Sequence, residues 1–71
     1  MNALRVSAHD VRFTNHGSIW LVEPLTPRAK THLVAHVDPE ALWFYGALVV
    51  EPRYIHDLAG ALMAAGFSVT V

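Results

Sequence analysis

The fold is decided by residues 46–71, which read GALVVEPRYIHDLAGALMAAGFSVTV. The apolar run after Gly46 is typical of a strand that is buried on both faces. Pro52 then opens a helical pattern, which should continue to Ala65 because Gly66 provides a left-handed C-cap. The residues after Gly66 alternate between apolar and polar, as in a half-buried strand. This part of the chain therefore predicts a strand, a helix and a second strand.

The predicted helix has an apolar stripe at i, i+3, i+4 and i+7 spacing. The stripe comprises Ile55, Leu58, Ala59, Leu62 and Met63, with Tyr54 at its edge. Gly60 costs the helix about 1 kcal/mol relative to alanine, which favours a close packing contact there. The last strand should bury Phe67, Val69 and Val71 on one face and present Ser68 and Thr70 on the other.

The first half of the chain predicts a hairpin and a helix. Residues 11–23 read as two strands around the turn Asn15-His16-Gly17, with Trp20 and Val22 on one face of the return strand, which begins at Ser18. Thr26 and Pro27 are a strong helix start, and this helix should end near Val37, before Asp38-Pro39. Asp38 can also cap a single following turn. The predicted apolar stripe comprises Ala29, Leu33, Val34 and Val37.

The order of elements is therefore ββαβαβ, a small two-layer α+β domain with two helices on a mixed four-stranded sheet. The domain spans residues 11–71, and residues 1–10 form a tail or a short strand. Each strand-helix-strand connection should be right-handed. Both helices can then cover one face and leave Ser68 and Thr70 on an open face, with Trp20 nearby. Helices on both faces are the alternative, because the strand order cannot be deduced from this sequence.

Composition narrows the classes of function. The 71 residues are 54% hydrophobic, contain no cysteine and carry a net charge of −1. The five basic residues are scattered, which disfavours nucleic-acid binding. No apolar run is long enough for a membrane span and no signal peptide is evident, so we expect a cytoplasmic protein. The high apolar fraction indicates a well-filled core or an apolar surface for a protein partner or a homodimer.

Histidines and carboxylates give weak candidates for chemistry. His32 and His36 share one helix face and could hold a metal with Asp38, His16 or His56 as a third ligand, although a solvated helix face is the favoured interpretation. Glu23 and Glu51 would lie together if the strands before them were parallel neighbours, but a charge preference at helix starts explains them better. No serine has a nucleophile-elbow context and no phosphate loop is present. We therefore expect no enzyme and no cofactor.

The aromatic residues are the best candidates for binding. Trp43, Phe44 and Tyr45 are consecutive, so at least one ring should reach the core and at least one should lie near the surface. Trp20 is added to this candidate protein-binding set. The polar helix face that follows, Arg53, His56 and Asp57, completes it.

Three segments carry a resemblance to a known family: residues 13–20 (FTNHGSIW), 23–26 (EPLT) and 46–54 (GALVVEPRY). They resemble a family of small uncharacterised bacterial proteins found in phages, plasmids and genomic islands, and the likeness covers roughly residues 11–71. Family members have an acidic, tryptophan-bearing first helix, whereas Lys30-Thr31-His32 stands in that region here. The resemblance implies no catalytic motif. It implies an accessory protein of a mobile element that binds a host protein, for example an anti-CRISPR or another anti-defence inhibitor.

The sequence thus predicts a non-enzymatic protein-binding module. A nucleic-acid-associated regulatory module is one alternative. A small metal- or ligand-binding domain that uses His32 and His36 is the other.

Overall fold

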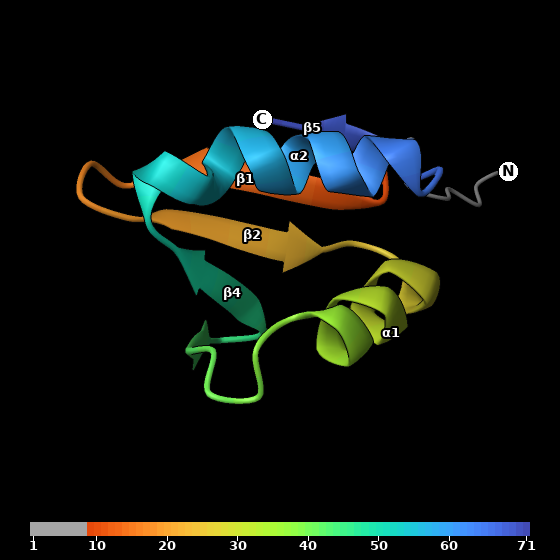
Figure 1. The fold of residues 1–71 in the computed structure, drawn as a ribbon, viewed down its shortest axis with the longest axis horizontal. Coiled ribbons are helices and arrows are strands. Elements are labelled where there is room, and N and C mark those ends of the chain that lie inside the picture. The colour runs from red at the N-terminus through yellow and green to blue at the C-terminus, as the bar shows by residue number, and fades with distance from the viewer. Residues whose placement is uncertain (1–8) are drawn as a thin grey trace, which may run out of the picture.

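A β-hairpin opens the described part of the chain, which is residues 9–71 of the computed structural model (Figure 1). β1 (Val11–Asn15) pairs antiparallel with β2 (Trp20–Pro24). Asn15 Oδ1 accepts the Gly17 N–H at 2.8 Å, and Gly17 has a φ of 86°, which glycine adopts without strain. The hairpin is confirmed, but its return strand begins at Trp20 rather than at Ser18. Of the predicted tail or short strand at residues 1–10, all but His9 and Asp10 lie outside the described residues.

α1 (Pro27–His36) begins and ends close to the predicted positions. Thr26 Oγ1 accepts the Ala29 N–H at 3.2 Å, and Val37 is already extended. Asp38 Oδ1 accepts the Glu40 N–H at 2.8 Å, which confirms the capped turn after the helix. Of the predicted stripe, Ala29 and Leu33 are buried and Val37 is half-buried. Val34 is 58% exposed, so its place in the stripe was wrong.

A second hairpin follows, and its first strand was not predicted. β3 (Trp43–Phe44) pairs antiparallel with β4 (Ala47–Val50) across the turn Tyr45-Gly46. The sheet therefore has five strands rather than four, and the predicted ββαβαβ order lacked β3. β3 forms because Trp43 and Phe44 adopt an extended conformation and pair with the apolar strand β4 across a two-residue turn.

The segment after β4 is helical, as residues 46–71 predicted. A 3₁₀ turn, η1 (Pro52–Tyr54), leads into α2 (Ile55–Ala64). Gly66, with a φ of 92°, donates its N–H to Met63 O at 3.0 Å, and the Phe67 N–H reaches Leu62 O at 3.0 Å. These two bonds form a Schellman motif, which confirms the glycine C-cap. β5 (Val69–Thr70) then closes the sheet.

Packing of α2 and β5 differs from the prediction at three positions. Ile55 and Leu62 are buried as expected, but Met63 is 57% exposed and Val71 is 91% exposed. Gly60 is exposed, and a Cβ built there meets no atom within 4 Å, so the predicted close contact is wrong. The sheet ends at β5, so it leaves the side chains of Met63 and Val71 uncovered.

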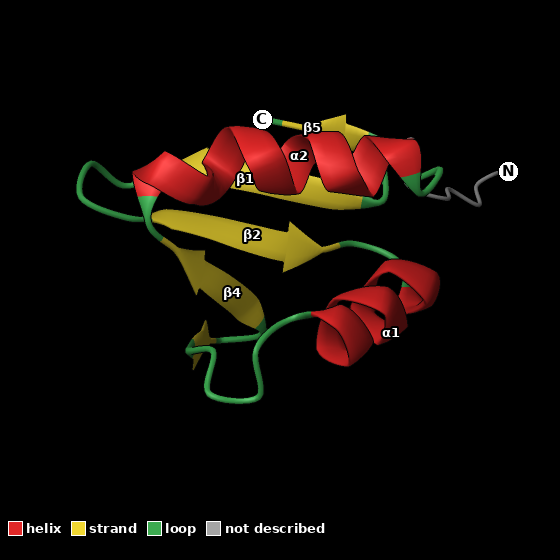
Figure 2. Cartoon of the chain, viewed as in Figure 1, coloured by secondary structure: helices red, strands yellow, loops and turns green. Residues whose placement is uncertain are grey.

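The strand order is β3-β4-β2-β1-β5, with β5 parallel to β1 and every other pair antiparallel. Because β2 and β4 are antiparallel, the connection through α1 is not the crossover between parallel strands to which the expected right-handedness applies. The strand registers place alternate residues on one face of the sheet, where they form the core together with both helices (Figure 2). The core comprises Val11, Phe13, Val22, Ala29, Leu33, Leu48, Val50, Ile55, Leu62 and Phe67.

Within residues 9–71, no helix covers the opposite face of the sheet. Thr70 lies on it, in register with Arg12, as the sequence predicted for an open face. Trp20 was expected near this face, but the pairing Trp20↔Val50 places it on the helix-covered face, where it packs half-buried against the core. Helices on both faces, the alternative topology, is therefore wrong.

Candidate functional site

The hairpin of β3 and β4 carries an uninterrupted run of exposed apolar side chains. Leu42 is 69% exposed, Trp43 39%, Phe44 54% and Tyr45 94%. We refer to residues 42–45 as the aromatic hairpin. Apolar side chains scattered singly over a surface need no explanation, but a contiguous group often marks a binding surface.

The turn of the aromatic hairpin has an unusual backbone. Tyr45 has a φ of 50° and Gly46 a φ of 83°, and the pairing Phe44↔Ala47 makes them the two central residues of a type I′ turn. Asparagine, aspartate or glycine normally occupies the first of these positions, because a left-handed conformation costs other residues about 1–2 kcal/mol. The turn therefore holds a tyrosine in a strained conformation with its ring in solvent.

The three aromatic rings divide between the two faces of the sheet. Trp43 lies opposite Leu48 on the helix-covered face, and Phe44 lies opposite Ala47 on the open face. The rings of Phe44 and Tyr45 meet edge to face with centroids 4.5 Å apart. The prediction that at least one ring reaches the core was wrong, since even Trp43 remains 39% exposed. β3 is the outermost strand, beyond the reach of both helices.

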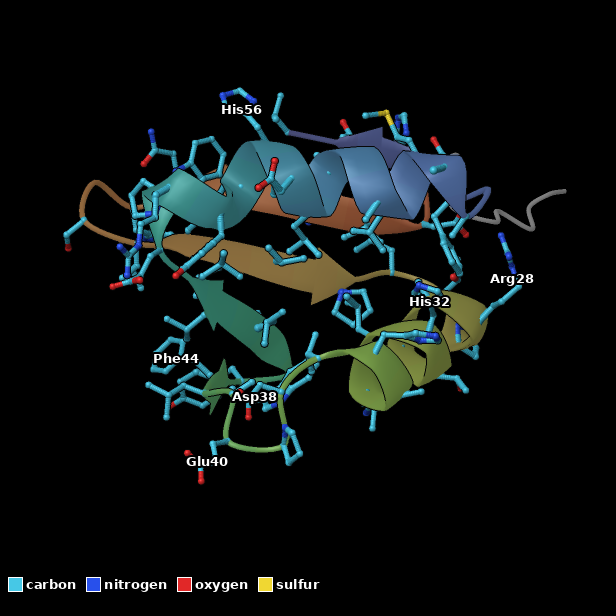
Figure 3. All side chains as sticks on the ribbon, in the orientation of Figure 1. Arg28, His32, Asp38, Glu40, Phe44 and His56 are labelled. Atoms are coloured by element: carbon cyan, nitrogen blue, oxygen red, sulfur yellow. The ribbon has the colours of Figure 1, made fainter. Side chains whose placement is uncertain are left out.

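A cleft of about 380 Å³ adjoins the aromatic hairpin along β4. Its apolar wall comes from three elements and is formed by Val37, Ala41, Leu48, Val49, Val50 and Leu58. Asp38, Glu51 and Tyr54 complete the lining. We call it the acidic cleft, because its two charged lining residues are carboxylates. Figure 3 shows Asp38 and Glu40 on the same side of the molecule as Phe44.

The other predicted binding residues are not all brought together. Arg53 pairs with Glu51 at 3.1 Å and lies 4.9 Å from the centre of the Tyr54 ring, so it stands beside the acidic cleft. His56 and Asp57 are exposed at the start of α2. His56 lies far from Phe44 in Figure 3. The predicted set thus divides into the aromatic hairpin before β4 and the polar residues Arg53, His56 and Asp57 after it, whereas Trp20 packs against the core.

The two helical histidines stack on each other. The rings of His32 and His36 have centroids 4.2 Å apart and an interplanar angle of 23°, and His36 Nδ1 donates to the His32 carbonyl oxygen at 2.9 Å. Among residues 9–71 no three His, Cys, Asp or Glu side chains gather in an arrangement that could hold a metal. The third ligands considered from the sequence, Asp38, His16 and His56, therefore do not complete a site.

The candidate carboxylate pair is separated. Because β2 and β4 are antiparallel, with Trp20 opposite Val50, Glu51 lies beside the start of β2, whereas Glu23 lies near the end of that strand. Glu23 instead pairs with Arg12 at 3.4 Å, across β1 and β2. This arrangement gives Glu23 and Glu51 no shared catalytic role.

Sequence reasoning missed a polar junction between β1, α1 and β5. The Asp10 carboxylate accepts the Ser68 N–H at 2.9 Å and the Thr26 hydroxyl at 3.1 Å, and Arg28 lies 3.7 Å away. The pKa of Asp10 is lowered chiefly by the hydrogen bond from the Ser68 backbone, with Thr26 and Arg28 adding to it against an opposing effect of desolvation. His9 Nδ1 lies 2.9 Å from Ser68 Oγ. The Asp10 carboxylate therefore links the start of β1 to the start of α1 and to the residue before β5.

Comparison with protein-family models, with characterised proteins and with solved structures gives no match for this chain. Within residues 9–71, neither helix has the length and apolar character needed to cross a membrane.

Proposed function

We propose that this chain is a small non-enzymatic protein-binding module, and that the aromatic hairpin is its contact surface. The observation that carries the proposal is the contiguous exposure of residues 42–45 on a hairpin of defined geometry. Tryptophan and tyrosine are enriched among the residues that dominate binding energy at protein interfaces.

The turn geometry supports a preformed contact. A two-residue type I′ turn fixes the directions of both strands, so less conformational entropy is lost when a partner binds. Tyr45 occupies a position where asparagine would be more stable, which is consistent with selection of the ring for binding. Strain of this kind is characteristic of functional sites.

The acidic cleft supports a choice of partner chemistry. It offers an apolar wall next to the carboxylates of Asp38 and Glu51, and the first of these has no ion pair among the described residues. An apolar side chain flanked by lysine or arginine matches this cleft in shape and charge. Trp43 is the ring of the aromatic hairpin on the same face of the sheet as the cleft residues Leu48 and Val50. The proposed partner therefore presents a basic segment to the cleft beside Trp43 and extends around β3 to contact Phe44 and Tyr45.

The biological setting follows from the sequence resemblance. We propose a mobile-element accessory protein that acts on a host protein, with an anti-CRISPR or other anti-defence inhibitor as one form of that role.

A capture experiment with matched variants tests the function. The wild-type chain, the double variant Phe44→Ser with Tyr45→Asn, and the control Met63→Ser are immobilised and exposed to the same bacterial lysate. Phe44 and Met63 are 54% and 57% exposed, so both changes remove a similarly accessible apolar side chain. We expect wild type and control to retain the same protein and the double variant to lose it. After purification of that protein, the hairpin variant should bind about 30-fold more weakly, as expected for a hot spot of about 2 kcal/mol. Equal capture by all three chains, or no specific capture, would refute the proposal.

A further inference from the structure

A second cleft, of about 610 Å³, lies between α1 and the connection from α2 to β5. Its lining comprises Pro27, Arg28, Thr31, His32, Ala35, His36, Ala65 and Phe67. We call it the imidazole cleft. None of its lining residues is acidic, whereas three carry cationic or protonatable nitrogen groups. We propose that the imidazole cleft binds a phosphate group, independently of the aromatic hairpin.

Four planar side chains that line this cleft contact one another in a row. The Arg28 guanidinium lies 4.2 Å from the centre of the Phe67 ring, the Phe67 and His32 rings are tilted by 50° with centroids 4.7 Å apart, and His32 and His36 stack at 4.2 Å. Phe67 is only 5% exposed, so the middle of the row is anchored in the core. Figure 3 shows Arg28 and His32 on the same side of the molecule. The row therefore holds two imidazoles and a guanidinium in a fixed order in the cleft.

The donors in this cleft are only partly used. Arg28 reaches Gly66 O at 3.4 Å and Asp10 at 3.7 Å, yet its side chain is 62% exposed. A guanidinium has five N–H groups, so several stay available. His36 donates Nδ1–H to its own helix, so its Nε2 donates to a phosphate oxygen when the ring carries both protons. The Thr31 hydroxyl adds a neutral donor to the lining.

A phosphate group matches this set of donors. Arginine recognises phosphate through paired N–H bonds, and charge-assisted bonds of this kind are stronger than neutral ones. Small side chains at Ala35 and Ala65 leave room in the cleft. Asp10 does not line the cleft, and its carboxylate accepts hydrogen bonds from Ser68 and Thr26.

Titration with inorganic phosphate, followed by two-dimensional NMR of the ¹⁵N-labelled chain, tests this inference. Phosphate should shift the signals of Arg28, Thr31, His32 and His36 in a saturable manner, and potassium chloride at equal ionic strength should not. His36→Gln should weaken phosphate binding about tenfold, the effect expected for loss of one charge-assisted hydrogen bond. Arg28→Gln should weaken it at least as much, with retention of the fold checked in the same spectra.

Two controls separate a site from diffuse charge. His56→Gln removes an exposed histidine from α2, and Lys30→Gln removes a cation from α1 that does not line the cleft. Both should leave phosphate binding unchanged. The inference is overturned if phosphate produces no saturable shift, if His36→Gln binds like wild type, or if Lys30→Gln weakens binding as much as Arg28→Gln does. Phenyl phosphate is titrated in parallel. If it shifts the same NMR signals as inorganic phosphate, the cleft accepts phosphorylated molecules. If it shifts none of them, the site accepts free phosphate alone.

Discussion

Replacement of Tyr45 by asparagine should stabilise the fold and weaken partner binding in the same variant. The substitution Tyr45→Asn keeps the type I′ turn, because asparagine accepts a φ of 50° far better than tyrosine does. The ring that it removes is 94% exposed, so it contributes little to the core.

The expected change follows from two opposing effects. Relief of the left-handed backbone contributes about 1–2 kcal/mol. Loss of the edge-to-face contact with Phe44, at 4.5 Å, subtracts about 0.5 kcal/mol at so exposed a position. The free energy of unfolding should therefore rise by about 1 kcal/mol, which corresponds to about 4–8 °C in Tm for a domain of this size.

Urea denaturation of wild type, Tyr45→Asn and Tyr45→Ala measures this effect. Alanine removes the ring but has the same difficulty with positive φ, so Tyr45→Ala should be no more stable than wild type. Equal free energies of unfolding for Tyr45→Asn and Tyr45→Ala would show that the backbone at Tyr45 carries no strain, and would refute this prediction. Retained binding of the captured partner by Tyr45→Asn would separately contradict the role of the ring.

Three further predictions concern stability. Gly60→Ala should raise the free energy of unfolding by about 1 kcal/mol in urea denaturation, since no atom lies within 4 Å of the new Cβ; a loss of stability would mean a hidden contact. Leu33→Ala should lower it by about 2–5 kcal/mol, because the side chain is 1% exposed, and a loss below about 1 kcal/mol would show that the core is loosely packed there. The lowered pKa of Asp10 stabilises the fold above the ordinary aspartate pKa of about 3.9, and that stability is lost as the pH falls through the lower folded value. Asp10→Asn should flatten the acid limb of the stability profile, and an unchanged limb would contradict this linkage.

The elements that local chemistry determines were predictable. Thr26 and Pro27 fix the start of α1, and Gly66 fixes the end of α2, because capping depends on residues within one turn. The first hairpin depends in the same way on Asn15 and Gly17.

Features set by distant pairing were not predictable. The antiparallel alignment of β2 and β4 and the outermost position of β3 depend on which strands meet, and no local pattern encodes that choice. Val34 and Met63 belong to helical stripes, yet the narrow sheet does not reach them. The aromatic residues were found by their composition, and the prediction that at least one ring lies near the surface is confirmed by Tyr45, whereas the exposure of all three rings was not predicted.

Neither cleft could be predicted from local sequence patterns. His32 and His36 drew attention by their spacing, but Phe67 comes to them from the far side of Gly66. The acidic cleft combines residues from the loop after α1, from β4, from η1 and from α2, and no single segment signals it.

The parallel pairing of β5 with β1 has a consequence for folding. Asp10 and Ser68 are 58 positions apart, and their hydrogen bond lies next to the pairing Val11↔Val69. Contacts between such distant positions require closure of a long loop, so they form after local hairpins have reduced the entropy that remains to be lost. A nascent chain still on the ribosome can form both hairpins but cannot complete the sheet until Ser68 has emerged. Until then the edge of β1 is open to pairing with another chain.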